Sequence, residues 1–363
     1  MKIWNRYVLR EWVAAFFCMH VVATGLLILE DVYKNLANFL VAHVAPRYLA
    51  KYYAYLAVSF YPVITPVAVF LSVLFVLGRM HRRNEIMAMR CAGVNILRIA
   101  KSIILGVVSL VVVNLAFEAV ITPKAIDYVT AFRIQVNGKA GHKTIFNGDA
   151  FYNRLANRIW FFGAFGKVSH KASTVFVTCY GKNGAEKVRI FANSAEFDVE
   201  KNCWRFVGGQ VVTFDVATAK PVKVEFFEEK HFKDFTESPK TIAASLKKIR
   251  DLSFEEVVNL LEYSNDAFAM ERNIFLVKFH RTFAKSASCM IIMFLAISFA
   301  VCGAKVNTAG NTAKASIFIL LFLIGGEIFA NLGNAGFMPP IAAAWAVNAI
   351  AIIPIIKLLR MAI

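Results

Sequence analysis

The sequence predicts a helical membrane protein in which six transmembrane helices, three and three, flank an inserted all-β domain. Of the 363 residues, 58% are hydrophobic, more than in a typical soluble protein. Between the third and fourth apolar segments, the apolar runs become short and strand-like. Six segments approach the roughly 20 apolar residues that a helix needs to cross a bilayer: about 12–30, 55–78, 100–121, 286–303, 315–333 and 341–358.

The distribution of Lys and Arg predicts the orientation of these helices. With the N-terminus in the cytoplasm, thirteen basic residues of the flanks and short loops lie on the cytoplasmic side. The short loops on the other side, 31–54 and 334–340, carry only Lys34, Arg47 and Lys51. This asymmetry follows the positive-inside rule. We therefore expect both termini in the cytoplasm and the middle domain outside, which is the periplasm if the cell is Gram-negative.

The sequence pattern of residues 124–270 predicts that this region forms the inserted domain. Runs such as STVFVTCYG and KVRIFANSAEFDV are separated by turn residues at roughly ten-residue spacing, a pattern typical of a sandwich, jelly roll or open barrel. After Pro239 the pattern becomes helical, with Ser253 as N-cap and Glu256 at the capping-box position. The expected parts are an N-terminal transmembrane half, 1–123, the β domain with its helical connector, 124–270, and a C-terminal transmembrane half, 271–363.

Charge and motif content exclude several classes of protein. The net charge is +17, but residues 124–270 hold 21 Lys/Arg against 17 Asp/Glu, so the excess flanks the apolar spans and indicates no nucleic-acid-binding domain. The sequence contains no GxxxxGK[ST], HExxH or GxSxG motif. We therefore expect no catalytic residue, metal or cofactor in this chain. For Cys179 and Cys203 two alternatives stay open, a disulfide and a pair of unpaired core thiols.

The stretch GRMHRRNEIMAMRCAGVN, residues 78–95, predicts a short basic helix between two spans. Asn84 can cap it and Gly93 can end it, which leaves about eight residues, too few for a stable isolated helix. It therefore needs a surface, either the inner leaflet or a groove on a cytoplasmic protein. Glu85 favours the protein, because anionic lipids repel a carboxylate.

Glu327 lies deep in the fifth apolar segment, where a charge costs about 2.5–3.5 kcal/mol on insertion scales. A proton or ion relay would need several coupled groups, and the sequence supplies few. We therefore favour a structural or interface role for Glu327.

Several features together resemble the LptF/LptG permease family of lipopolysaccharide export. NEIMAMRCAGV is similar to the family's coupling-helix motif, an acidic residue followed by apolar positions and Ala-Gly. The three-plus-three spans around a β-rich insert, the SFEEVVNLLE helix and GFMPPIAAAW before the last span fit the same family, over nearly the full length. A proline usual at the start of the fourth span is replaced by KFHRTFAK. The first span and coupling loop lean towards the LptG-like member.

This resemblance implies a non-catalytic permease subunit of the bacterial inner membrane, with a periplasmic β-jellyroll through which lipopolysaccharide passes to a bridge protein. The implied partners are a paralogous LptF/LptG-type permease, an LptB-type ATPase dimer that binds ATP and Mg, an LptC/LptA-type periplasmic protein, lipopolysaccharide and membrane lipids. In the family, positions matching Lys34 and Arg133 approach the headgroup. The coupling helix is expected at about 84–93. The expected ATPase-coupling residues are Arg82, Glu85, Ile86, Met89, Arg90 and Gly93.

Lys278, Arg281 and Lys285 lie on the expected outer side of the fourth span, against the positive-inside trend. Phosphates of the lipid would explain Lys278 and Arg281 as further headgroup contacts. Ordinary solvation beside the β domain is the alternative.

Two rival functions remain at this stage. A membrane scaffold that displays a β domain for protein assembly would need no nucleotide, so co-purification of an ATPase distinguishes it from a permease. An integral membrane enzyme acting on lipids is disfavoured, because the sequence shows no nucleophile or metal constellation.

Overall fold

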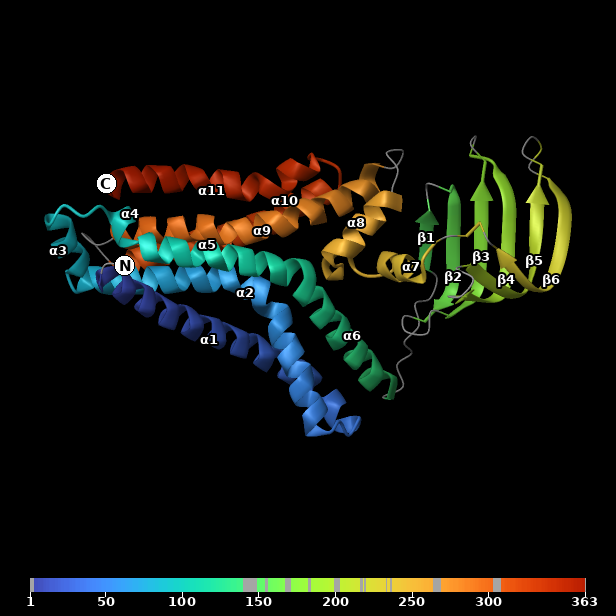
Figure 1. The fold of residues 1–363 in the computed structure, drawn as a ribbon, viewed down its shortest axis with the longest axis horizontal. Coiled ribbons are helices and arrows are strands. Elements are labelled where there is room, and N and C mark those ends of the chain that lie inside the picture. The colour runs from blue at the N-terminus through green and yellow to red at the C-terminus, as the bar shows by residue number, and fades with distance from the viewer. Residues whose placement is uncertain are drawn as a thin grey trace. The chain divides into compact units, whose positions relative to one another are not determined.

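The computed structural model describes residues 3–139, 149–153, 156–166, 171–181, 184–198, 203–215, 218, 220–232, 234–235, 237–263, 269–302 and 308–362. The chain forms two compact units (Figure 1). The helical unit comprises Met1–Ala140 and Leu276–Ile363, and the β unit comprises Gly141–Phe275.

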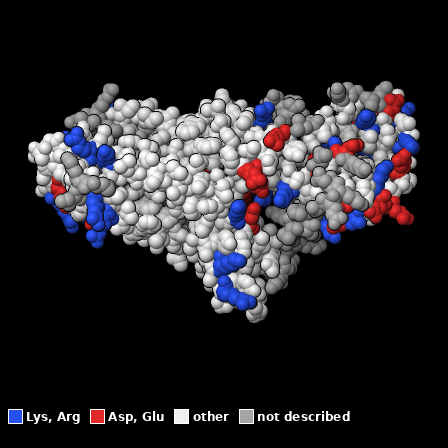
Figure 2. All heavy atoms as spheres, in the orientation of Figure 1, with Lys and Arg blue, Asp and Glu red and all other residues white. Residues whose placement is uncertain are grey.

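The helical unit contains the six apolar helices that the sequence predicts. Those long and apolar enough to cross a membrane span Trp4–Val41, Pro46–Arg82, Lys101–Val136, Arg272–Ala300, Ala313–Asn334 and Pro340–Leu358. The prediction of six spans is thus confirmed, and one face of the helical unit shows a broad belt without charged side chains (Figure 2). The helices of this unit are α1 (Ile3–Val41), α2 (Pro46–Arg82), α3 (Glu85–Cys91), α4 (Ile96–Ile99), α5 (Lys101–Ala116), the π-helix η1 (Phe117–Ile121), α6 (Thr122–Lys139), α9 (Ala269–Cys302), α10 (Thr308–Asn334) and α11 (Pro340–Ala362).

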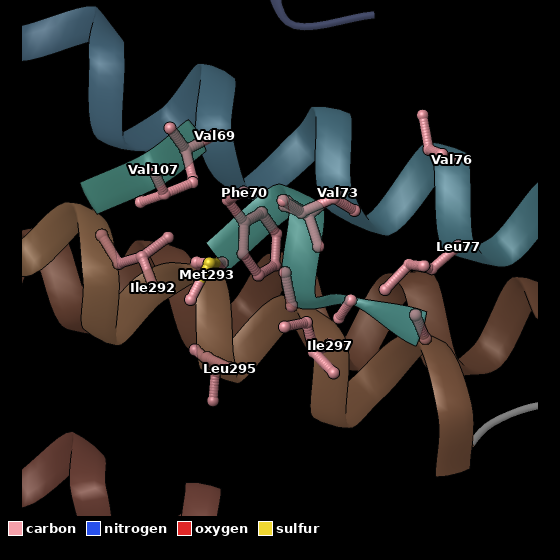
Figure 3. Close-up of a cluster of buried hydrophobic side chains, with 14 of the residues drawn as sticks. Val69, Phe70, Val73, Val76, Leu77, Val107, Ile292, Met293, Leu295 and Ile297 are labelled. Atoms are coloured by element: carbon pink, nitrogen blue, oxygen red, sulfur yellow. The ribbon is translucent and has the colours of Figure 1, made fainter. Parts of the chain in front are cut away.

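The centre of the helical unit is formed by α2 and α9. The most apolar windows of these two helices are 61% and 67% buried, against 11% for α1 and 22% for α10. Val69, Phe70 and Val73 of α2 pack with Ile292 and Met293 of α9 (Figure 3). The outer helices leave most of their apolar surface uncovered, as expected where lipid solvates it.

Small and polar residues bring neighbouring helices close together. A Cβ at Gly106 of α5 would lie 2.5 Å from the ring of Trp12 on α1, so only glycine permits this approach. Ser288 of α9 donates to Asn348 Oδ1 of α11 at 2.9 Å, and Asn348 Nδ2 donates to the Ala284 carbonyl at 3.0 Å. Such interhelical hydrogen bonds satisfy polar groups that lipid would leave without partners.

The third span continues without a break beyond the expected end of the N-terminal half. The π turn η1 joins α5 to α6, and α6 reaches Lys139 within the helical unit. Residues 124–139, expected in the middle domain, pack here instead, because Val129 and Val136 share a core with Phe39, Tyr52 and Leu56 of α1 and α2.

The β unit holds an antiparallel sheet whose described strands follow the chain order, β1-β2-β3-β4-β5-β6. The predicted inserted all-β domain is confirmed, and its described strands form a six-stranded antiparallel meander. Short connections favour this order, because consecutive strands then pair locally. The strands are β1 (Asp149–Asn153), β2 (Arg158–Phe165), β3 (Lys171–Tyr180), β4 (Glu186–Asp198), β5 (Cys203–Phe214) and β6 (Pro221–Phe232).

One irregular row crosses the sheet from β2 to β6, and we name it the crease. Gly163, Thr174, Asn193, Gly208 and Glu228 lie opposite one another without ladder pairing, while the register continues unchanged on both sides. Thr174 and Gly208 have φ of 51° and 62°, the left-handed region. Buried residues on one face stand three apart across the crease, as in Phe162 and Phe165, Ala172 and Val175, and Ala192 and Ala195.

This buried face, the inner face, is filled by the chain itself. Trp160, Trp204 and Phe206 are fully buried there and pack with Phe235 and with Ile242 of α7 (Pro239–Ser245). Glu237, also fully buried, accepts a hydrogen bond from Asn153 Nδ2 at 2.6 Å and pairs with Arg158 at 3.4 Å. The segment after β6 is therefore held across the inner face by both apolar packing and a buried carboxylate.

The remaining helical elements of the β unit are η2 (Ile249–Asp251) and α8 (Phe254–Tyr263). The predicted capping box at the start of α8 is confirmed. The Ser253 N–H donates to Glu256 Oε2 at 2.8 Å, and the Glu256 N–H donates to Ser253 Oγ at 3.2 Å. Cys179 on β3 and Cys203 on β5 are both free, so the unpaired alternative holds.

Candidate functional site: a short basic helix and a set of paired charges

The short helix predicted between the second and third spans is α3. Its end is as predicted, because Gly93 has φ of 78° and the Gly93 and Val94 N–H groups donate to carbonyls of the last turn. The capping role of Asn84 is wrong: Asn84 has φ of 60° and its side chain makes no cap hydrogen bond. It serves as the left-handed turn residue between α2 and α3, a conformation that Asn tolerates.

One side of α3 packs against the chain itself. Ile86 is fully buried in the core of the helical unit and Met89 is partly buried beside it. Ile86 therefore cannot contact a partner at this surface, which corrects the expected contact. Met87, 42% exposed, is the apolar side chain that α3 presents outwards. The sequence alone did not distinguish these positions, because an eight-residue helix between unknown neighbours has no assignable inner side.

The exposed side of α3 combines this apolar side chain with charge. Arg82, Arg83 and Arg90 are exposed around it. Glu85 is partly exposed and lies 4.0 Å from Arg83, which leaves the carboxylate within reach of another donor. Ion pairs of this kind are weak in water and exchange partners readily. The surface can therefore accept a partner with both apolar and charged groups.

A second set of charges links the two halves of the helical unit. Glu118 of η1 is 9% exposed and lies 4.0 Å from Lys278 Nζ and 3.6 Å from Lys285 Nζ of α9. Arg281, on the same helix as these lysines, pairs with Glu327 of α10. The structural role expected for Glu327 thus has a specific partner. Sequence reasoning passed over Glu118 because its partners lie about 160 residues away.

Lys34 and Arg133 are ion-paired at the ends of α1 and α6. Lys34 donates to Glu30 at 2.5 Å, and both side chains are more than half exposed. Arg133 pairs with Asp31, and its Nε donates to Tyr52 Oη at 2.8 Å. Tyr52 in turn donates to Asp31 at 2.9 Å. Each of the four expected headgroup cations therefore has a carboxylate partner, and none of the described contacts joins the α1–α6 pair to the α9 pair.

Near Glu118, two buried polar side chains of the third span have no described partner. Both amide atoms of Asn114 and the hydroxyl of Thr122 lack a hydrogen bond. Asn114, Glu118 and Thr122 follow one another at four-residue steps along α5, η1 and α6, which places them along one side of the helix. The π-helix η1 lies within this stretch, and π turns inside α-helices are often found at functional sites. Together with the ammonium groups of Lys278 and Lys285, this side of the helix offers hydrogen-bond donors that suit an anionic polar group.

The comparison with protein families decides between the remaining classes. A family model described as lipopolysaccharide export system permease LptF/LptG matches residues 6–361. The chain belongs to the LptF/LptG family. It is accordingly a multi-pass inner-membrane protein and a permease subunit. The match is to the joint family, so it does not separate LptF-like from LptG-like members. A comparison with curated proteins gives no match.

Within the parts of the chain that the structure describes, no group of three or more His, Cys, Asp or Glu side chains is placed to hold a metal ion. The candidate sites of this LptF/LptG protein are therefore a helix surface at α3, the paired charges and the sheet of the β unit.

Proposed function

We propose that this LptF/LptG protein is the transmembrane subunit of an ABC-type transporter that extracts lipopolysaccharide from the inner membrane and passes it to a periplasmic bridge. The observation that carries the proposal is the family match over residues 6–361, together with a short helix that presents apolar and charged groups outwards. ATP and Mg²⁺ are bound by a separate LptB-type ATPase dimer. A paralogous permease completes the membrane complex.

In this proposal, α3 couples the ATPase to the helical unit. The positive-inside distribution supports a cytoplasmic location for α3 and for both termini. Met87, Glu85 and the neighbouring arginines contact the ATPase. Ile86 and Met89 transmit the movement, because they anchor α3 in the same core as α2 and α5. The β unit is then periplasmic.

The lipid headgroup is proposed to bind at the end of the helical unit that carries Lys34, Arg133, Lys278 and Arg281. Two lysines, Lys278 and Lys285, face the single carboxylate of Glu118. A phosphate can pair with the lysines while Glu118 stays in place, because each ammonium group has three donors. The carboxylate partners of Lys34 and Arg281, which are Glu30 and Glu327, are both more than half exposed. Each of these two cations can therefore exchange its partner.

The β unit is proposed to dock an LptC/LptA-type protein through the edge of its sheet. Of the two described edge strands, β6 has twelve residues and β1 has five. Residues 221–226 of β6 are exposed throughout. A long uncovered edge can accept a strand from another protein, so β6 is the preferred docking edge.

Reconstitution tests the function as a whole. The chain is expected to co-purify with an ATPase and to support ATP-dependent release of lipopolysaccharide from proteoliposomes to a periplasmic acceptor. Photocrosslinkers at 34 and 281 should capture lipopolysaccharide, and one at Lys314, exposed near the start of α10, should not. Assembly of periplasmic proteins without any ATPase would support the scaffold instead, and would contradict the proposal.

A further inference from the structure

Lys and Arg side chains gather at the end of the helical unit that carries α3, α4 and the start of α1 (Figure 2). Among them, four cations from three helices are exposed: Arg6 and Arg10 of α1, Arg98 of α4 and Lys101 of α5. Within the part of the chain that the structure describes, none of these four forms an ion pair. Glu11, next to Arg10 in the sequence, pairs instead with Arg79 of α2. This surface therefore attracts anions.

The four cations lie beside the line along which α1 packs against α5, which we name the α1–α5 seam. Both helices run in the same direction from this end of the unit (Figure 1). Trp12 of α1 lies directly against Gly106 of α5. One turn nearer this end are Val8, which is fully buried, and Ser102, which is 2% exposed. Asn5 follows on the same side of α1, so Asn5 and Ser102 both belong to the end of the seam that the cations flank.

Two buried polar atoms at this end of the seam have no hydrogen-bond partner. They are Asn5 Oδ1 and Ser102 Oγ. Other serines of the spans avoid this state, because Ser72 and Ser109 donate to carbonyl groups of the preceding turn at 3.0 Å and 2.7 Å. A buried hydroxyl without a partner is unfavourable. A ligand that supplies partners to these two atoms would therefore gain affinity from them.

The chemistry of the groups specifies the headgroup of that ligand. Guanidinium and ammonium groups bind phosphate oxygens strongly, and the Ser102 hydroxyl can donate to the same phosphate. Asn5 Oδ1 only accepts, so it needs a donor such as a hydroxyl group of the ligand. A phosphate that carries a hydroxylated substituent, as in a glycerophosphate, satisfies both requirements.

The surroundings indicate that the ligand is a lipid. Phe17, seven residues after Arg10 and thus on the same side of α1, is 61% exposed. Leu105, four residues after Lys101 on α5, is 57% exposed. On each helix a cation is therefore followed by an exposed apolar side chain farther into the span. This order matches the headgroup and the acyl chains of a phospholipid.

We propose that this end of the α1–α5 seam binds an anionic glycerophospholipid whose headgroup carries a hydroxyl group, as a resident lipid that is not transported. With the cytoplasmic location proposed for the termini, the lipid belongs to the cytoplasmic leaflet. The bound phosphate bridges cations of α1, α4 and α5, and so ties the start of α1 to the elements that follow α3. The seam is closed over Ser102 in this structure, and the long side chains of Arg6 and Arg98 move aside when the headgroup enters.

Native mass spectrometry of the full-length protein in detergent tests the assignment. Phosphatidylglycerol is the anionic probe, and phosphatidylethanolamine is the probe without net charge. Phosphatidylglycerol should bind more tightly by at least about tenfold, because its phosphate is not balanced by an ammonium group. Glycerol 1-phosphate, which has the same headgroup chemistry without acyl chains, should not be retained. Equal binding of the two lipids, or saturable binding of glycerol 1-phosphate at the same concentrations, would overturn the proposal.

A charge-matched pair of double variants locates the site. Each basic residue near a phosphate contributes roughly fivefold, so Arg6→Gln combined with Arg98→Gln should weaken phosphatidylglycerol binding about 30-fold. Lys314→Gln combined with Lys357→Gln removes the same charge from exposed positions of α10 and α11 and should leave the binding unchanged. Equal losses in the two double variants would show that general electrostatic attraction is responsible, and would overturn the site.

A second pair of variants tests the buried hydroxyl and serves if the arginine variant does not fold. Ser102→Ala should weaken phosphatidylglycerol binding roughly tenfold, because it removes a donor to a charged phosphate. Ser109→Ala, on the same helix but with its hydroxyl already bonded to its own backbone, should not change it. Equal affinity of the wild type and Ser102→Ala would overturn the placement at the seam.

Two other occupants of this surface are distinguished in the same experiments. Loss of ATPase co-purification in the Arg6 and Arg98 double variant, with unchanged lipid binding, would assign the surface to a protein partner. Displacement of phosphatidylglycerol by purified lipopolysaccharide would assign it to the transported lipid. Either result would overturn the proposal, and neither depends on whether export itself is reconstituted.

Discussion

Replacing Glu118 by glutamine is expected to destabilise the helical unit, because this one carboxylate faces two lysines of the opposite half. Glu118 is 9% exposed, and the side chains of Lys278 and Lys285 are 15% and 33% exposed. The substitution keeps the shape of the side chain and removes only its charge. Both ammonium groups then remain in a largely apolar region without their common partner.

The size of the effect follows from burial. Removal of one partner of a buried ion pair costs about 3–5 kcal/mol. The stem of a lysine can reach towards a membrane surface, and Lys285 is one-third exposed, so the cost falls at or below the lower end of this range. We therefore expect a loss of about 2–3 kcal/mol, which is roughly a 30- to 150-fold change in the unfolding equilibrium constant.

Denaturant unfolding of the full-length protein in detergent measures this loss. The matched control is Glu30→Gln, which removes the partner of Lys34 in a mainly exposed pair and should change stability by less than about 1 kcal/mol. Addition of Lys285→Met to Glu118→Gln should restore part of the loss, because it removes a charge without a partner. Equal stability of the wild type and Glu118→Gln, or no recovery in the double variant, would refute the reasoning.

Three further predictions follow from other parts of the chain. Glu85→Lys should weaken co-purification of the ATPase on the order of 100-fold without unfolding the protein. Ile86→Ala should instead lower the free energy of unfolding by about 2–5 kcal/mol, because it opens a cavity in the core. The reverse pattern would contradict the orientation of α3. Gly106→Leu should separate α1 from α5, because even a Cβ at this position meets the ring of Trp12. A cysteine pair placed across these two helices should then crosslink less efficiently than in the control Gly78→Leu, where the added Cβ meets no atom within 4 Å. Burial opposes ionisation of Glu256, but hydrogen bonds from Lys247 and Ser253 outweigh it and lower its pKa. The stabilisation from Glu256 is therefore present above its usual pKa of 4.5 and disappears as the pH falls through the lowered value, and hydrogen exchange of α8 should lose this acid sensitivity in Glu256→Gln.

The start of α8 and the start of α3 show how far local sequence predicts structure. Ser253 and Glu256 form the predicted capping box because both hydrogen bonds lie within four residues of chain. Asn84 had the same kind of support but adopts the left-handed turn that the direct junction of α2 and α3 requires. Local patterns therefore predict the helices and strands well. The conformation of a junction between two elements depends instead on where the next element must pack.

The sequence by itself determined the six spans, the β-rich insert and the family resemblance, because the length of an apolar run and the alternation of a strand are properties of short segments. Tertiary structure decided that Ile86 faces inwards and Met87 outwards, that Glu118 meets Lys278 and Lys285, and that the strands form a meander with β6 at one edge. It also decided that Asn5 and Ser102 lie at the same end of the α1–α5 seam. The physical reason is that burial, ion pairing and strand order depend on contacts between residues far apart in the chain, and no local pattern of side chains specifies which distant segment supplies them.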